Sequence, residues 1–207
     1  MTLNPDLFAG KKARCRPLLD RLERLFEEMD NAYASIAGQY GFQCTGCTDN
    51  CCLTRFYHHT LIEYLHLMEG LHTLEAVAQE KINTRVQVVC EQMSAADCSG
   101  EPMRIMCPLN SGGRCRLYAY RPMICRLHGI PHELQSPGGS ISRMPGCDAF
   151  FDQCRSGGKS DYICFDRTPL YRRMALLEKE MRQETGYTDP IKLTVAEMLA
   201  TFKRKPL

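Results

Sequence analysis

The segment "CTGCTDNCC" holds the densest group of reactive side chains, namely Cys44, Cys47, Cys51 and Cys52. Thiols this crowded serve disulfides, a redox dithiol, zinc or an iron–sulfur cluster. The chain has 13 cysteines, so any disulfide scheme leaves at least one thiol unpaired. A redox dithiol lies between a strand and a helix, and no strand is predicted before Cys44. The pattern therefore favours metal ligation.

A second group of cysteines follows in "CPLNSGGRCRLYAYRPMICRLHGIPH" and in "MPGCDAF". With the first group it gives eight ligand candidates: Cys44, Cys47, Cys51, Cys52, Cys107, Cys115, Cys125 and Cys147. Iron–sulfur clusters and structural zinc commonly take four cysteines each, so eight thiolates suit two sites, or one site with four further thiols. Cys154 and Cys164 compete with Cys147 for the eighth position.

The adjacent pair Cys51 and Cys52 bears on the kind of metal. Side chains of neighbouring residues point in different directions, so these thiolates are poorly placed to share one small tetrahedral ion. They suit different metals, different irons of a cluster, or one ligand beside one thiol that does not ligate. Structural zinc usually shows two tight ligand pairs, whereas only Cys44 and Cys47 are closely paired here. The spacing therefore favours an iron–sulfur cluster over zinc.

The segment from Met103 to His132 is basic, with five arginines and no Asp or Glu. A site of four thiolates is net negative, and nearby guanidinium groups offset that charge and donate to sulfur. Arg121 and Arg126 flank Cys125 and are the predicted cofactor-contacting residues. Two other interpretations stay open: a solvated basic loop, or a docking patch for an acidic or phosphorylated partner.

Four of the six histidines lie close to the cysteine motifs: His58, His59, His128 and His132. Histidine ligates zinc and occasionally iron–sulfur clusters. Because enough cysteines are present, we expect each of these histidines to have a role other than ligation. His128 is the first to test, because it lies three residues beyond Cys125.

The motif resembles that of a known family. "CTGCTDNCC" followed by "CPL" and "CRLYAYRPMICR" is similar to the CxxCxxxCC zinc- or iron-chelating domain, whose members are called YkgJ-like cysteine-cluster proteins. The resemblance covers roughly residues 44–130 through seven cysteines and four other residues: Cys44, Cys47, Cys51, Cys52, Cys107, Cys115, Tyr118, Arg121, Pro122, Cys125 and Arg126. It implies metal binding, since relatives are described as iron–sulfur proteins and a distant one methylates flagellin lysines.

Helices are predicted before, within and after this motif region, which spans 44–147. Apolar spacing and capping signals predict helices over 17–37, 60–70, about 74–93 and 168–185, and a short one after Thr194. The expected caps are the capping boxes Thr60–Glu63 and Thr194–Glu197 and the cap residue Thr168, and Val77 is expected to face inward. The stretch 98–165 is rich in Gly, Pro, Cys and Arg and shows no convincing strand pattern. We therefore expect a mainly α fold whose helices surround an irregular, cysteine-rich metal-binding centre.

Composition limits the remaining possibilities. The formal charge of +2 gives no strong nucleic-acid signal, and 44% hydrophobic residues suit one globular domain over 1–207. The sequence shows neither an apolar run of membrane-spanning length nor a secretory signal, so a cytoplasmic location is expected. Cys15, which precedes a helix, and Cys90, on an apolar helical face, are expected to be bystanders.

Common catalytic motifs are missing, including a P-loop, G-x-G-x-x-G, G-x-S-x-G and H-E-x-x-H. The leading prediction is an iron–sulfur protein with one or two 4Fe–4S clusters, acting in electron transfer or within a redox or methyl-transfer enzyme with an unknown redox or protein partner. The alternative is a zinc-binding structural or protein-interaction module without catalysis. A third class, a cysteine-based catalyst, would use Cys52 as a free thiol of low pKa.

Overall fold

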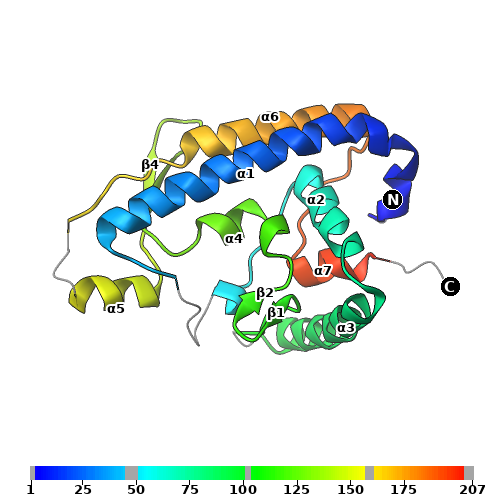
Figure 1. The fold of residues 1–207 in the computed structure, drawn as a ribbon, viewed down its shortest axis with the longest axis horizontal. Coiled ribbons are helices and arrows are strands. Elements are labelled where there is room, and N and C mark those ends of the chain that lie inside the picture. Colours follow the sequence, from blue (N-terminus) through cyan, green and yellow to red (C-terminus); the bar gives the residue numbers. More distant parts are fainter. Residues whose placement is uncertain (1–2, 45–50, 101–103, 157–160, 203–207) are drawn as a thin grey trace.

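The computed structural model describes residues 3–44, 51–100, 104–156 and 161–202, and these form a mainly helical fold. Figure 1 shows two long helices, α1 (Lys12–Tyr40) and α6 (Thr168–Thr185), lying side by side along one edge of the molecule. The helices α2 (Leu61–His72) and α4 (Met123–Leu127) pack beneath them, and α3 (Ala76–Ser99) packs against α7 (Val195–Ala200). The mainly α prediction is confirmed.

The helix α1 is longer than the predicted 17–37. It follows a short 3-10 helix, η1 (Pro5–Lys11), so Pro17 lies inside α1 and costs it one backbone hydrogen bond. The expected stripe is buried: Leu18, Leu22, Leu25 and Met29 are all less than a tenth exposed. The helix ends at Gly41, whose φ of 72° is the left-handed conformation that glycine adopts without strain.

Gly70 was expected to end the second helix, and this prediction is wrong. The helix α2 starts at the Thr60 cap, whose hydroxyl accepts the Glu63 N–H, and continues past Gly70 to His72. A Cβ on Gly70 would lie 2.3 Å from Cγ of Tyr120. Glycine is therefore present at this position because Tyr120 packs against the helix backbone, not because the helix stops.

The other helices differ from their predictions mainly at the ends. The helix α3 covers 76–99 in place of about 74–93, and Val77, expected to face inward, is 66% exposed. Thr168 is the first residue of α6, not its cap, whereas Gly186 ends this helix as expected. The capping box of Thr194 and Glu197 at the start of α7 is confirmed.

The central segment contains two antiparallel hairpins that the sequence pattern did not reveal. One joins β1 (Asn110–Ser111) to β2 (Arg114–Cys115), and the other joins β3 (His132–Gln135) to β4 (Ile141–Met144). Gly112 and Gly113 form the tight turn of the first hairpin, with φ angles of 62° and 81°. The strands are too short to show an alternating pattern.

Short helical pieces complete this centre: η2 (Cys51–Leu53), η3 (Tyr118–Tyr120) and α5 (Asp148–Ser156). Side chains from α1, α2, α4 and α6 form most of the main apolar core. A small second cluster of buried side chains, Val89, Met93 and Ala196, joins α3 to α7. In the described part of the chain, no helix combines the length and the apolar composition needed to cross a bilayer.

Candidate metal centre

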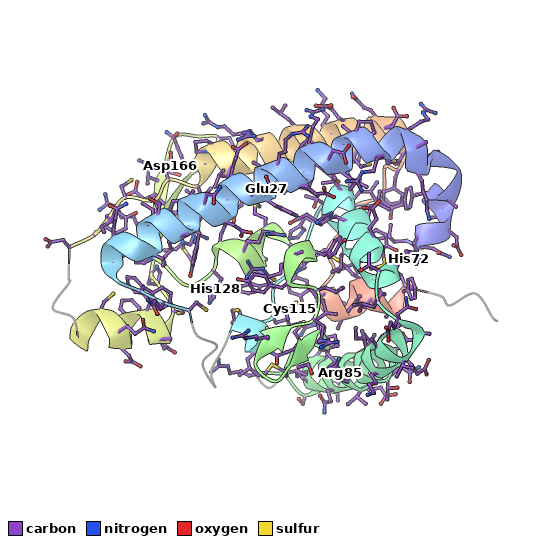
Figure 2. The ribbon with its side chains drawn as sticks, viewed as in Figure 1. Glu27, His72, Arg85, Cys115, His128 and Asp166 are labelled. Carbon is purple, nitrogen blue, oxygen red and sulfur yellow. The ribbon has the colours of Figure 1, made fainter. Side chains whose placement is uncertain are left out.

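Six of the eight predicted ligands line a single cavity of about 790 Å³: Cys44, Cys51, Cys52, Cys107, Cys115 and Cys125. They come from segments far apart in the sequence, including η2, the β1–β2 hairpin and α4. Figure 2 labels Cys115 near the middle of the molecule, beside the short hairpin. Cys47 lies outside the described residues.

Four of these thiols form a first set, Cys52, Cys107, Cys115 and Cys125. The backbone N–H of Cys107 donates to the carbonyl of Cys52 at 2.8 Å, which fixes η2 against the start of the hairpin. Burial raises the pKa of Cys107 to about 12, and negative charge on Cys52 and Cys115 adds to this effect. Burial also raises the pKa of Cys115 and, most strongly, of Cys125. These three thiols would ionise only beside a strong positive charge.

A second set of thiols, Cys44, Cys51 and Cys147, lies close enough to Tyr33 on α1 to affect its pKa. Burial raises the pKa of Tyr33, and charge on Cys44, Cys147 and Cys51 raises it further. Cys147 packs partly buried against the main core, and its N–H donates to the Gly129 carbonyl at 2.9 Å. By contrast, the Cys164 thiol donates to a carboxylate oxygen of Glu133 at 3.6 Å. Cys147 thus shares an environment with two motif cysteines.

Cys51 and Cys52 have opposite acidities despite being neighbours. The Cys51 thiol donates a hydrogen bond to Cys52, which raises the pKa of Cys51 and lowers that of Cys52 to about 6. The Asn110 amide and the Arg121 guanidinium lower the pKa of Cys52 further. Cys52 is therefore the one thiol of the first set whose surroundings favour the thiolate before any metal binds.

The spacing of the thiols is wide. Among the described residues, no three cysteine sulfurs lie within 4.8 Å of one another. Among the described residues, one group of three potential ligand side chains has its ligand atoms within that distance: Glu23, His66 and Glu69, on α1 and α2. Arg16 already donates to both carboxylates of that group, at 2.6 Å to Glu23 and 3.0 Å to Glu69. The Arg16 guanidinium thus offsets part of the negative charge of this group.

The two predicted arginines occupy different environments. Arg126 is 6% exposed and donates to the carbonyls of Arg121 and Ala119 and to Asp30, the last at 2.6 Å. These bonds fasten α4 to α1, and the guanidinium also lies 4.2 Å from the centre of the Phe26 ring. All three of its nitrogens are engaged in this bracing, so the structure gives Arg126 a supporting position.

Arg121 lines the cavity and faces the thiols. One terminal nitrogen lies 3.4 Å from Asp30, and the guanidinium stacks on the Tyr118 ring at 3.6 Å. Its Nε is buried and has no hydrogen-bond partner in the described part of the protein. The Arg121 charge and a hydrogen bond from the Asn110 side chain both act on Cys52. An unpaired buried donor beside thiols suits the acceptor sulfurs of a metal–thiolate site.

The histidines near the motifs have other surroundings. The His59 Nδ1 lies 3.0 Å from the Ile191 carbonyl, and the His132 Nδ1 lies 3.4 Å from that of Ile130. His128 packs edge-on against the ring of Phe56. His58 is 3% exposed and lines the cavity. Among the described residues, none of these four histidines belongs to a group of three potential ligand side chains whose ligand atoms all lie within 4.8 Å of one another.

Sequence reasoning missed one residue that holds the site in place. Glu63 is buried, and its carboxylate accepts the Met123 N–H at 2.7 Å, at the start of the short helix that carries Cys125. The capping signal that predicted α2 included this residue, but its carboxylate caps α4 as well. Burial raises the pKa of Glu63, so this contact orders α4 at an energetic cost.

Comparison of the chain with models of protein families, with curated proteins and with solved structures found no match. The resemblance of the cysteine motif to the YkgJ-like proteins therefore stays a prediction. The chemistry of the site must be inferred from the donor set itself: buried thiols, an ionisable Cys52 and an unpaired N–H group facing them.

Proposed function

We propose that this chain is an iron–sulfur protein that uses Cys52, Cys107, Cys115 and Cys125 as cluster ligands. The observation that carries the proposal is the convergence of these four thiols, from three separate segments, on one cavity. Cysteine is the usual ligand of iron–sulfur clusters, and four per cluster is the common number. The chemistry that such a cluster supplies is one-electron transfer.

The electrostatics of the thiols support a bound cation. Burial raises the pKa of Cys107, Cys115 and Cys125, so these groups are protonated near neutral pH without a metal. A coordinating metal deprotonates a thiol outright. Metal binding would therefore convert these buried thiols into thiolate ligands and stabilise the folded protein. Cys52, with its pKa lowered to about 6, is the thiol best prepared to make the first bond.

The spacing of the thiols supports a cluster over a single zinc ion. Four thiolates at 2.3 Å from one tetrahedral zinc lie about 3.8 Å from one another. No three described sulfurs are mutually within 4.8 Å. In a cluster each thiolate binds a different iron, so its four sulfurs lie farther apart than those of a zinc site.

The second set supports a further ligand group. Charge on Cys44, Cys51 and Cys147 affects the pKa of Tyr33, and Cys47 belongs to the same motif as Cys44 and Cys51. We propose that these four cysteines hold a second cluster. The neighbours Cys51 and Cys52 would then serve different clusters, which fits their divergent side chains and unequal acidities.

The role that fits this site is electron transfer, alone or as the redox part of an enzyme. Cys44 is exposed, and Tyr118, which lines the same cavity beside Arg121, is 61% exposed. A redox partner can therefore approach the thiols closely. Arg121 offsets the negative charge of the thiolates and would favour the reduced state of a cluster.

Anaerobic purification tests the proposal. We expect a brown protein with broad visible absorption that dithionite bleaches, and a paramagnetic resonance signal after reduction. A colourless protein that carries stoichiometric zinc would overturn the proposal and favour a zinc-binding structural or interaction module.

A further inference from the structure

The cavity that holds the thiols has a second wall that is apolar and contains no cysteine. This wall consists of Val89, Met93 and Ala96 on α3, Ala196 on α7, and Ile105. At about 790 Å³ the cavity falls within the range of roughly 300–1,000 Å³ found for small-molecule sites. Metal ligation by the thiols does not involve this apolar wall, so the wall is available to bind a further molecule.

The two walls belong to different parts of the protein interior. Val89, Met93 and Ala196 form the small apolar cluster between α3 and α7, whereas Cys107 and Cys115 pack against the main core. The cavity therefore lies between a small apolar cluster and part of the main core. A molecule with an apolar body would bury its surface against the α3–α7 wall, where the hydrophobic effect favours it.

The polar part of the lining is cationic. It includes Arg55, Arg114 and Arg121, and no Asp or Glu is among the described lining residues. Arg55 is paired with Asp97, and Arg121 with Asp30. Arg114, by contrast, is exposed at the edge and makes no ion pair with any described residue. An anionic group at the rim would find its counter-charge there.

The cavity lining also includes a buried ring nitrogen of His58 that lacks a partner in the described part of the protein. The backbone of His58 is fixed by two hydrogen bonds to Leu193, and its side chain is 3% exposed. Its Nε2 makes no hydrogen bond within the described part of the protein. Burial lowers the pKa of His58 to about 4, so the ring is neutral at pH 7. An unpaired buried group of this kind is costly unless a ligand or water completes it.

We propose that this cavity binds a small organic anion with an apolar body. The body lies against the α3–α7 wall, the anionic group lies near Arg114 at the rim, and His58 Nε2 forms a hydrogen bond with a polar atom of the ligand. The inference deepens the proposed function, because the bound molecule would lie against the cluster ligands. Binding itself depends on the walls, so it can be tested separately.

Calorimetric titration with two isosteric probes tests the proposal at the level of chemistry. 1-Naphthaleneacetate carries an apolar body and a carboxylate, and 1-naphthaleneacetamide has the same body without charge. We expect one saturable site for the anion and weaker binding of the amide, by about threefold to fivefold, because an exposed ion pair contributes little.

Two pairs of variants locate the site. Ala96→Trp fills the cavity and should weaken binding of the anion at least about tenfold. Ala95→Trp, on the exposed face of the same helix, should leave binding unchanged. Arg114→Gln should remove the preference for the anion over the amide, whereas Arg116→Gln, which does not line the cavity, should retain it. His58→Phe should weaken both probes.

Three results would overturn the inference: no saturable binding, equal binding to Ala96→Trp and Ala95→Trp, or an anion preference that survives Arg114→Gln. Circular dichroism and thermal melting confirm that each variant is folded. Iron is measured in every sample, so failure of the anion-binding proposal can be distinguished from failure of the iron–sulfur proposal. Iron without probe binding contradicts this inference alone, and probe binding without iron contradicts the iron–sulfur assignment alone.

Discussion

Single residues of this protein owe their chemistry to what surrounds them more than to their type. Cys51 and Cys52 are adjacent in the chain, yet a hydrogen bond between their thiols shifts their pKa values in opposite directions. The sequence predicted unequal duties for this pair from the divergence of neighbouring side chains. It named Cys52 as the candidate thiol of low pKa, but not the groups that lower this pKa, because Asn110 and Arg121 are far away in the sequence.

His66 gives a residue-level prediction about pH. Its side chain is 2% exposed between the rings of Phe26 and Tyr120, and burial lowers its pKa to about 4. Glu23 raises this pKa, while Arg126 and Arg16 lower it. Below the ordinary histidine pKa of about 6.5, the unfolded chain binds a proton that the folded protein does not, so stability falls as the pH falls toward 4.

Urea unfolding at a series of pH values measures this effect. The contribution of His66 to the loss of stability between pH 7 and 4.5 should be on the order of 2 kcal/mol. His66→Gln should lose correspondingly less stability over that range than the parent protein. His59→Gln, at an exposed position, is the control and should follow the parent. Parallel curves for the parent and His66→Gln would contradict the assignment.

At the scale of elements, the contact between α2 and η3 positions the segment that leads to Cys125. Gly70 allows Tyr120 to pack against the backbone of α2, because a Cβ there would lie 2.3 Å from the Tyr120 ring. We expect Gly70→Ala to destabilise the protein by roughly 1–3 kcal/mol, despite the better helix propensity of alanine.

Gly38 provides the matched control for this prediction. It also lies within a helix, α1, but a Cβ at this position would meet nothing within 4 Å. Gly38→Ala should therefore be neutral or stabilising, by about 0.5–1 kcal/mol. Denaturant unfolding of the two variants checks both values. Equal effects at the two sites would show that the packing of Tyr120 is unimportant.

The elements also show how far the sequence could predict this fold. Helices with regular apolar spacing, such as α1 and α6, were found, because a repeated pattern over many residues is a strong signal. The predicted ends of the helices were less accurate. Pro17 lies inside α1 and Gly70 inside α2, because the tertiary packing keeps both helices continuous at these residues. The hairpins of the centre were missed because two-residue and four-residue strands carry no measurable period.

For the candidate site, the cysteine types and spacing predicted which residues converge, and six of the eight candidates line one cavity. The partners from other elements were not predicted. Asn110, Glu63 and the α3–α7 wall reach the site only through the folding of the chain, and no local pattern marks them. Arg126 was predicted beside the cofactor from its position next to Cys125, and its hydrogen bonds go to Asp30 on α1 and to the carbonyls of Ala119 and Arg121.

The whole molecule contains a part that apolar packing holds and a part that we expect a metal to hold. α1 and α6 pack against each other through the main core, whereas residues 104–147 consist of short elements joined by loops. Loss of the metal should therefore loosen 104–147 first. After anaerobic chelation, limited proteolysis should cut within this range before it cuts α1 or α6. An unchanged cleavage pattern after complete metal removal would show that the centre folds without it.

The central claim is that Cys52, Cys107, Cys115 and Cys125 ligate an iron–sulfur cluster while other thiols do not. Cys15 is 3% exposed in α1, and burial raises its pKa, so it is an inert thiol outside the cavity. Its replacement by alanine should cost on the order of 1 kcal/mol of stability. Cys90, half-buried on α3, should behave in the same way.

The most direct measurement is iron and inorganic sulfide per chain in anaerobically purified single Cys→Ala variants. Cys15→Ala and Cys90→Ala should match the parent protein in both. Cys52→Ala, Cys107→Ala, Cys115→Ala and Cys125→Ala should each lose most of the iron and sulfide of one cluster, because each deletes one bond to metal. If Cys15→Ala and Cys90→Ala lower the iron content as much as Cys115→Ala and Cys125→Ala do, the ligand assignment is wrong.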